Sequence, residues 1–262
     1  MATDKEYVHI LQNKIKKVSM KLVDRIIRKI DWFYNKAKLK DKIDFYSKRF
    51  SKKDLVFDIG ANAGNRIDPF IKIGAKVIAV EPNPKLANKL KNKYASKVDV
   101  IQKAIGNREE IIDLYINDTD VLSTTSKEFI EKAKKTGRFG ELSNKFNESV
   151  KVEMIPMKYL FEEYGYPVFL KIDVEGLEYE ILKTLIDTKV DKLSFEFAIP
   201  ETIEDVLLSI KHLQSIGYKR FNISFGESME FITNTNMEYN DFKRLIKQLP
   251  KMSWGDIYVF NK

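Results

Sequence analysis

Strands and helices are predicted to alternate along most of the chain, because its hydrophobic positions switch repeatedly between strand and helix spacing. The apolar runs Leu55–Ile59 and Lys76–Val80 predict two buried strands. Between them, apolar positions recur with helical spacing from Asn65 to Ile73. Further strands are predicted at 98–102, 110–117, 150–155, 168–172, 192–197, 219–224 and 254–260, and further helices at 84–94, 157–164, 178–188, 203–216 and within 234–249. This alternation predicts an α/β fold with a parallel sheet.

The first 50 residues show a different pattern, and we expect residues 1–50 to form a helical extension to a main domain of residues 51–262. One apolar stripe with a very basic opposite face predicts a long helix, its stripe made of Val8, Leu11, Ile15, Val18 and Leu22. A second, short helix is predicted from Lys40 to Phe50. Three roles stay open for the stripe: packing on the main domain, forming the seam of a homodimer, or lying on a membrane surface.

Residues 118–149 form a long polar insertion between two predicted strands. It contains the run Ser123–Ser126 and many charged positions, and its apolar residues predict one helix. Long polar insertions are usually functional or mobile, so one interpretation is a lid or a substrate-recognition loop. The other interpretation is a plain excursion on the surface.

Composition narrows the class of protein. The formal net charge is +8, but the lysines are spread along the chain, so a lysine-rich proteome explains the charge better than a nucleic-acid partner does. The absence of cysteine excludes disulfides, thiolate metal sites and a cysteine nucleophile, and it favours a reducing compartment such as the cytoplasm. We expect no transmembrane helix and no signal peptide, because the required apolar runs are missing.

A glycine turn after the first strand predicts a ligand site. Gly60 and Gly64 let a ligand approach the backbone closely, and the helix that follows exposes free N–H groups at its start. The turn lacks both the GxGxxG pattern of a dinucleotide site and the Gly-Lys-Ser/Thr of a P-loop. Glu81, at the tip of the next strand, is placed to accept hydrogen bonds from ribose hydroxyls. Together these features predict a nucleoside-containing cofactor.

Three motifs carry a resemblance to a known family: Asp58–Gly64, Ala79–Pro84 and Leu170–Glu178. They resemble the FkbM family of S-adenosylmethionine (SAM)-dependent methyltransferases over roughly Asp54 to Phe260, and the third motif is the most specific. The resemblance implies a Rossmann-like class I methyltransferase fold, with a seven-stranded, mostly parallel sheet, helices on both faces and an antiparallel last strand. It also implies SAM as cofactor and methyl transfer, often to a hydroxyl of a sugar or natural product.

The resemblance also implies roles at the cofactor. Asp58 would orient the turn or the methionine ammonium, Glu81 would bind the ribose, and Pro82 and the backbone of Ala104 would contact adenine. Because strand ends of a parallel sheet meet at one edge, we expect these loops to converge on one crevice. The candidate cofactor contacts are Asp58, Gly60, Asn62, Gly64, Glu81, Pro82, Ala104 and Asp173.

The catalytic candidates are carboxylates and one lysine. A sulfonium already activates its methyl group, so the protein mainly positions the reactants, while a hydroxyl acceptor benefits from a base. Asp173 is the first candidate for base or cofactor-amine partner, Glu175 the second, and Glu196 the third. Lys171 shares a strand face with Asp173, and it either pairs with the carboxylates or loses its proton and acts as the base. Alternatively, Lys171 and Glu196 only balance charge. Three carboxylates could also hold Mg²⁺, but we predict no metal.

The leading function is a SAM-dependent O-methyltransferase that acts on a hydroxyl of a sugar, a glycan or a glycosylated metabolite. Base methylation is disfavoured because Asp173-Val-Glu-Gly176 offers no aromatic side chain to stack on a flipped base. One alternative is an RNA 2′-O-methyltransferase, which the net charge would suit. The other is a catalytically silent SAM-binding module that dimerises through its N-terminal helix. Asn65–Asp68 departs from the family, which often has an aromatic–threonine pair there.

Overall fold

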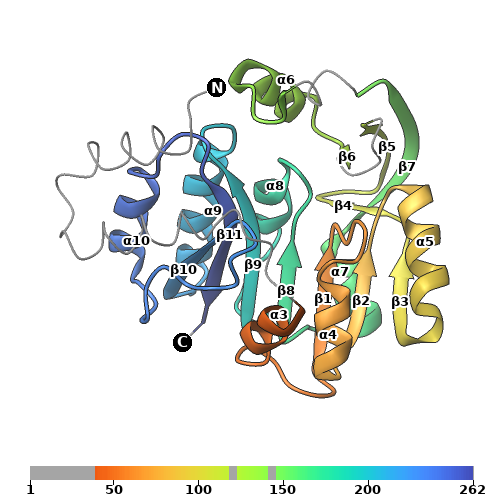
Figure 1. The fold of residues 1–262 in the computed structure, drawn as a ribbon, viewed down its shortest axis with the longest axis horizontal. Coiled ribbons are helices and arrows are strands. Elements are labelled where there is room, and N and C mark those ends of the chain that lie inside the picture. Colours follow the sequence, from red (N-terminus) through yellow and green to blue (C-terminus); the bar gives the residue numbers. More distant parts are fainter. Residues whose placement is uncertain (1–38, 118–122, 141–145, 262) are drawn as a thin grey trace.

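The computed structural model describes residues 39–117, 123–140 and 146–261. The predicted long N-terminal helix lies outside these residues. A seven-stranded sheet with the strand order β10-β11-β9-β8-β1-β2-β3 forms the centre of the molecule (Figure 1). Its strands are β1 (Leu55–Ile59), β2 (Lys76–Val80), β3 (Val98–Ile101), β8 (Phe169–Ile172), β9 (Lys192–Ala198), β10 (Arg220–Phe225) and β11 (Trp254–Phe260).

The direction of the strands confirms the expected fold class. Strands β1, β2, β3, β8 and β9 pair in parallel, whereas β11 lies between β9 and β10 and is antiparallel to both. This is the mixed sheet of a Rossmann-like class I methyltransferase, with the last strand inserted as predicted. The central strands are mostly apolar and buried along almost their whole length, as expected for a sheet that is covered on both faces, with Asp58 and Lys171 as buried charged exceptions.

Helices cover both faces of this sheet. Helices α3 (Leu39–Tyr46), α4 (Ile67–Ile73) and α5 (Pro84–Tyr94) share one hydrophobic core with one face. Side chains from the other helices form a second core with the opposite face; these helices are α7 (Met157–Tyr164), α8 (Glu178–Leu182), α9 (Ile203–Ser215) and α10 (Tyr239–Ile246). The two cores hold the carboxyl ends of β1, β2 and β8 in fixed positions.

A second, four-stranded sheet lies beside the carboxyl edge of the first, with the order β4-β7-β5-β6 (Figure 1). Strands β5 (Glu110–Ile116) and β7 (Glu148–Pro156) confirm two predicted strands, while β4 (Ala104–Gly106) and β6 (Ser123–Thr124) were not predicted. The insertion contains one helix, α6 (Lys127–Thr136), as expected. The described residues of the insertion are therefore part of the folded structure.

One predicted helix is shorter than its sequence pattern. The helix expected at 178–188 ends at Leu182. The next residues form tighter, 3₁₀-type turns, in which the N–H groups of Thr184 and Leu185 donate to the carbonyls three residues before them. Leu185 is buried while Ile186 is exposed, so the apolar pattern continues beyond the regular helix.

Residues 39–50 pack against the main domain through aromatic side chains. Phe45, Tyr46 and Phe50 are buried, and the ring of Tyr46 lies 4.8 Å from that of Phe70 in an edge-to-face arrangement. The division of the chain at residue 50 stays a prediction. Within the described residues, no helix is both long and apolar enough to cross a bilayer.

Candidate functional site

A cavity opens at the carboxyl edge of the central sheet, between it and the second sheet, and the empty space there, about 640 Å³, includes a part that is open to solvent. Six of the eight predicted cofactor contacts line it, which brings together the loops after β1, β2, β3 and β8. These six are Gly60, Asn62, Glu81, Pro82, Ala104 and Asp173. The predicted convergence of four loops on one crevice is therefore confirmed in the geometry.

Glu81 is fixed in the wall of the cavity by backbone donors. Its side chain is almost fully buried, and its two carboxylate oxygens accept hydrogen bonds from the N–H groups of Asn62 at 2.7 Å and Asn83 at 2.8 Å. Burial raises the pKa of Glu81 to about 7, although both backbone bonds act to lower it. Each oxygen keeps a further lone pair, so the carboxylate can still accept bonds from a diol.

Asp58 lies beneath the turn rather than in the wall of the cavity. It is 1% exposed, and neither carboxylate oxygen has a hydrogen-bond partner within the described residues. Burial raises the pKa of Asp58 to about 6, against the attraction of Lys171 and Arg66. A buried carboxylate with two unsatisfied oxygens is rare in folded proteins. Asp58 lies two residues before Gly60, so its side chain can orient the turn. Its carboxylate also favours a positive charge close by.

Gly64 faces away from the cavity. A Cβ atom at this position would come within 2.7 Å of the hydroxyl of Tyr94 on α5, and the glycine has a φ of +84°. The hydroxyl of Tyr94 donates to the carbonyl of Gly64 at 3.2 Å. Gly64 therefore shapes the turn by letting α5 pack closely, and the structure gives it no contact with the cavity.

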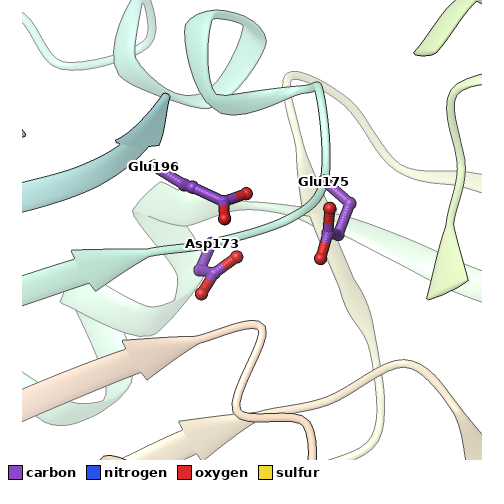
Figure 2. Close-up of side chains that lie close together, drawn as sticks. All are labelled: Asp173, Glu175 and Glu196. Atoms are coloured by element: carbon purple, nitrogen blue, oxygen red, sulfur yellow. The ribbon is translucent and has the colours of Figure 1, made fainter. Parts of the chain in front are cut away.

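Three carboxylates meet at the end of the cavity beside β8 and β9. One oxygen each from Asp173, Glu175 and Glu196 lies within 4.8 Å of the others (Figure 2). Burial and the neighbouring Asp173 raise the pKa of Glu175 to about 8, and the same two causes raise the pKa of Glu196. Such a cluster takes up protons near neutral pH, which suits it to accept one from an acceptor. Oxygen atoms grouped in this way also suit Mg²⁺, and the absence of a resident metal stays a prediction.

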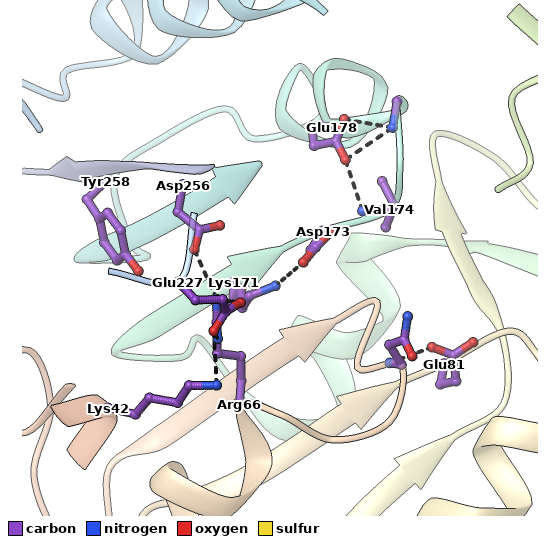
Figure 3. Close-up of polar contacts among 12 residues, drawn as sticks. Lys42, Arg66, Glu81, Lys171, Asp173, Val174, Glu178, Glu227, Asp256 and Tyr258 are labelled. Atoms are coloured by element: carbon purple, nitrogen blue, oxygen red, sulfur yellow. Dashed lines mark hydrogen bonds and ion pairs between the residues drawn. The ribbon is translucent and has the colours of Figure 1, made fainter. Parts of the chain in front are cut away.

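Lys171 pairs with this cluster from inside β8. Its side chain is 2% exposed, and Nζ lies 2.6 Å from Oδ2 of Asp173 (Figure 3). Burial acts to lower the pKa of Lys171, but attraction to Asp173, Asp256 and Asp58 outweighs it, and the pKa is raised. A lysine with a raised pKa keeps its proton at neutral pH. The geometry therefore favours the charge-pairing role of Lys171 over its role as base.

A buried ion network, not predicted from the sequence, lies behind the turn. Arg66 donates to both carboxylate oxygens of Glu227, at 2.5 and 2.8 Å, and also reaches Asp256 at 3.5 Å (Figure 3). Lys42 on α3 pairs with Glu227 at 3.0 Å. Arg66 stands in the segment that departs from the family pattern, and its side chain serves this network. The network joins α3 to the start of α4.

The second sheet closes the cavity on the side away from β1. Strand β6 and the residue after it contribute three hydroxyl side chains to the wall, and Oγ1 of Thr124 donates to the carbonyl of Glu175 at 2.7 Å. The hydroxyl-rich run in the insertion was a signal for this wall, but the sequence left open whether the insertion faced the site. The second sheet contributes Ala104, Ile105, Leu114, Ser123 and Thr124 to the wall, and Thr125 follows directly after β6.

Among the described residues, the single histidine, His212, does not line the cavity. His212, in the body of α9, lies with Nε2 2.8 Å from the carbonyl oxygen of Leu185, which suits a structural side chain. His9 lies outside the described residues. The polar residues in the cavity wall are carboxylates, hydroxyl residues, Asn62 and Lys103.

The fold and the cavity together define an enzyme class that binds a nucleoside cofactor at the carboxyl edge of its sheet. Residues 58–246 match the methyltransferase FkbM domain, and the chain belongs to this family. It is a SAM-dependent methyltransferase, with SAM as methyl donor and S-adenosylhomocysteine as product.

Solved structures show similarities at low sequence identity. A precorrin-6y C5,15-methyltransferase from Geobacter metallireducens GS-15 is 13% identical, with 89% of this chain and 95% of that chain covered and a TM-score of 0.43. A TehB-like SAM-dependent methyltransferase from Corynebacterium glutamicum is 8% identical, with 85% and 87% covered and a TM-score of 0.43. A comparison with curated proteins gave no match.

The residues of the cavity fit SAM. Glu81 offers acceptor oxygens for two ribose hydroxyls, and Pro82 and Ala104 lie in the same wall as apolar neighbours for a base. The unsatisfied carboxyl group of Asp58 and the carboxyl group of Asp173, which pairs with Lys171, are the acidic groups available to an ammonium. Both ends of the cofactor therefore find matching groups in the described residues.

Proposed function

We propose that the protein transfers the methyl group of SAM to a hydroxyl of a sugar, a glycan or a glycosylated metabolite. The observation that carries the proposal is the carboxylate cluster of Asp173, Glu175 and Glu196, which lies beside the cavity that also contains Glu81. SAM supplies a methyl group already activated by its sulfonium. The protein has to bind it, orient the acceptor and remove the hydroxyl proton.

Each residue of the site has a role in this proposal. Glu81 holds the ribose, and the backbone at Gly60 and Asn62 surrounds the amino-acid end of SAM. Glu175 accepts the proton of the acceptor hydroxyl, because its raised pKa matches neutral pH and it lines the cavity. Asp173 pairs with Lys171 and supports the ammonium of the cofactor. Relative to the sequence-based ranking, the two carboxylates thus exchange roles.

Binding and turnover test the proposal separately. Titration calorimetry should show saturable SAM binding by the wild type and much weaker binding by Glu81→Ala. Transfer of an isotope-labelled methyl group from SAM should then be followed by mass shift across a panel of sugars and oligosaccharides. Glu175→Gln should keep SAM binding and lose transfer. Unchanged SAM binding in Glu81→Ala would contradict the assignment of the site.

The net charge of +8 favours one second candidate function, an RNA 2′-O-methyltransferase, which further measurements test. If the acceptor were an RNA 2′-hydroxyl, labelled methyl groups would appear in RNA, and RNA affinity would fall steeply with salt. SAM binding without transfer to sugars or RNA would instead support a silent SAM-binding module.

We place the enzyme in the cytoplasm because it has no cysteine. A homodimer formed through residues 1–50 completes the proposal, and light scattering with and without these residues tests it.

A further inference from the structure

The loop that connects β8 to α8 has a backbone conformation that its own residues do not favour. Glu175 has a φ of 56°, in the left-handed region that residues other than glycine rarely adopt, and Gly176 follows with a φ of 102°. The loop also brings the carboxylates of Asp173 and Glu175 close to Glu196, where like charges repel. Contacts from outside the loop must therefore hold it in place.

Glu178 holds the loop from the side of α8. It is the first residue of that helix and is 5% exposed. Its Oε1 accepts a hydrogen bond from the N–H of Val174 at 2.9 Å, and its Oε2 accepts one from the N–H of Gly176 at 3.1 Å (Figure 3). Hydrogen bonds to an ionised acceptor are about twice as strong as neutral ones. The N–H groups on either side of Glu175 are thus bound to one buried carboxylate.

Thr124 holds the same loop from the second sheet. Its hydroxyl donates to the carbonyl of Glu175 at 2.7 Å and accepts from the N–H of Ser126 at 3.0 Å. Thr124 is itself buried, so water does not compete for the bond to Glu175. Glu178 therefore binds the backbone N–H groups of the residues before and after Glu175, and Thr124 binds the carbonyl group of Glu175 itself.

Glu178 does not belong to the carboxylate cluster. Its oxygens are not among the three that lie within 4.8 Å of one another, and it does not line the cavity. Both of its oxygens are engaged by backbone donors of the loop. Its position suits a residue that acts through the loop rather than on a ligand.

We propose that Glu178 and Thr124 are positioning residues that hold Glu175 in its left-handed conformation and thereby present Asp173 and Glu175 to the cofactor and acceptor. The identity of these ligands rests on the function proposed above. The loop also supplies part of the cavity wall, through Asp173, Val174, Glu175 and Leu177. Loosening the loop therefore weakens SAM binding and slows methyl transfer while leaving the remainder of the fold intact.

Hydrogen exchange and calorimetry test the role of Glu178. Glu178→Gln keeps the size of the side chain but removes its charge and turns one acceptor atom into a donor that faces backbone N–H groups. We expect amide exchange in residues 173–177 to accelerate and the SAM dissociation constant to rise, each by about tenfold. The matched control is Glu180→Gln on the same helix, whose side chain pairs with Lys183 and Asn107 and should leave both quantities unchanged.

Two variants of Thr124 test the second contact. They still test the proposal if Glu178→Gln does not fold. Thr124→Val preserves the shape of the side chain but removes the hydroxyl, and it should accelerate exchange in the loop and weaken SAM binding. Thr124→Ser restores the hydroxyl and should restore both properties.

Three outcomes would overturn the proposal. They are unchanged loop exchange in Glu178→Gln or Thr124→Val, equal behaviour of the valine and serine variants, and faster loop exchange with no change in SAM affinity. A global rise in exchange for both Glu178→Gln and Thr124→Val would assign the two residues to overall stability instead. If the wild type itself failed to bind SAM, the proposed function would fail, whereas the exchange data would still report whether the loop is held.

Discussion

The carbonyl oxygen of Asp173 lies 1.7 Å from the point where a Cβ atom on Gly60 would stand. The loops after β1 and β8 therefore meet backbone to backbone, and both residues line the cavity. Gly60 also has a φ of +80°. Position 60 thus requires glycine for two independent reasons, its conformation and the space taken by its neighbour.

Gly60→Ala should destabilise the protein and abolish measurable SAM binding. A left-handed alanine and an atomic overlap together should lower the free energy of unfolding by about 3 kcal/mol. Urea unfolding and SAM calorimetry measure the two effects. Gly137→Ala is the matched control, because Gly137 also has a positive φ of +71° but has nothing within 4 Å of its Cβ position. Equal losses in both variants would show that the contact with Asp173 has no effect of its own.

SAM affinity should depend on pH through Glu81. The pKa of Glu81 is raised to about 7 by burial, so the carboxyl gains a proton as pH falls through that value. A protonated carboxyl has less capacity to accept hydrogen bonds from ribose hydroxyls. The SAM dissociation constant should therefore rise by about tenfold for each pH unit below 7, the limiting slope for binding that requires one ionised group.

The variant Glu81→Gln isolates this effect. Glutamine cannot ionise, so its SAM affinity should be weak at pH 8 and should change much less between pH 8 and pH 6. Calorimetry at both pH values measures the difference. An equally steep pH dependence in Glu81→Gln would assign the titration to another group, such as Asp58, whose pKa is raised to about 6.

Glu196→Gln should stabilise the protein at alkaline pH. The pKa of Glu175 is raised from 4.5 to about 8, and that of Glu196 is also raised, so these carboxyls bind protons more tightly in the folded chain than in the unfolded one. Their contribution to stability is greatest below the unfolded pKa and declines as pH rises through the folded pKa. Removing one charge should raise the free energy of unfolding at pH 8 by about 1 kcal/mol.

The same substitution should change stability much less at pH 5, where the cluster holds protons in both proteins. Urea unfolding at pH 5 and pH 8 gives the comparison. Glu180→Gln, at an exposed glutamate, should show no such pH dependence. A Glu196→Gln protein that is less stable than the wild type at pH 8 would contradict the like-charge repulsion within the cluster.

Lys171→Met should be destabilising. It leaves Asp173, whose side chain is 29% exposed, beside other carboxylates without its partner at 2.6 Å, and losing a hydrogen-bonded charged partner in this way lowers stability by about 1–3 kcal/mol. The double variant Lys171→Met/Asp173→Asn removes the unpaired charge and should recover part of the loss. Denaturant unfolding of the single and double variants measures both values, and a double variant no more stable than Lys171→Met would refute the pairing.

The sequence predicts the central sheet well because each strand there is set by local chemistry. β1 and β2 coincide with the predicted runs, since strands buried on both faces are mostly apolar. α5 coincides with the predicted helix because Pro84 starts it and Asn83 caps it. The convergence of Glu81 and Asp173 follows from the parallel order alone.

The rest of the site depends on contacts between distant residues. β4 and β6 contain three and two residues, too few to show any periodicity, and they exist only by pairing with β7 and β5. Arg66 and Glu227 are 161 residues apart in the sequence, and neither position indicates its partner. Glu178 ends the third family motif, but its position in the sequence does not indicate that its carboxylate binds the backbone of the loop.

The place of β11 between β9 and β10 has a consequence for synthesis of the chain. β10 has no other neighbour in the central sheet, and Asp256, next to Arg66, is contributed by this last strand. While the ribosome still holds residues 254–260, β10 is separated from β9, and the cationic Arg66 lacks one of its anionic neighbours. Completion of the sheet must therefore wait until residues 254–260 have left the ribosome, and a premature stop before Trp254 would leave β10 without β11 to pair with.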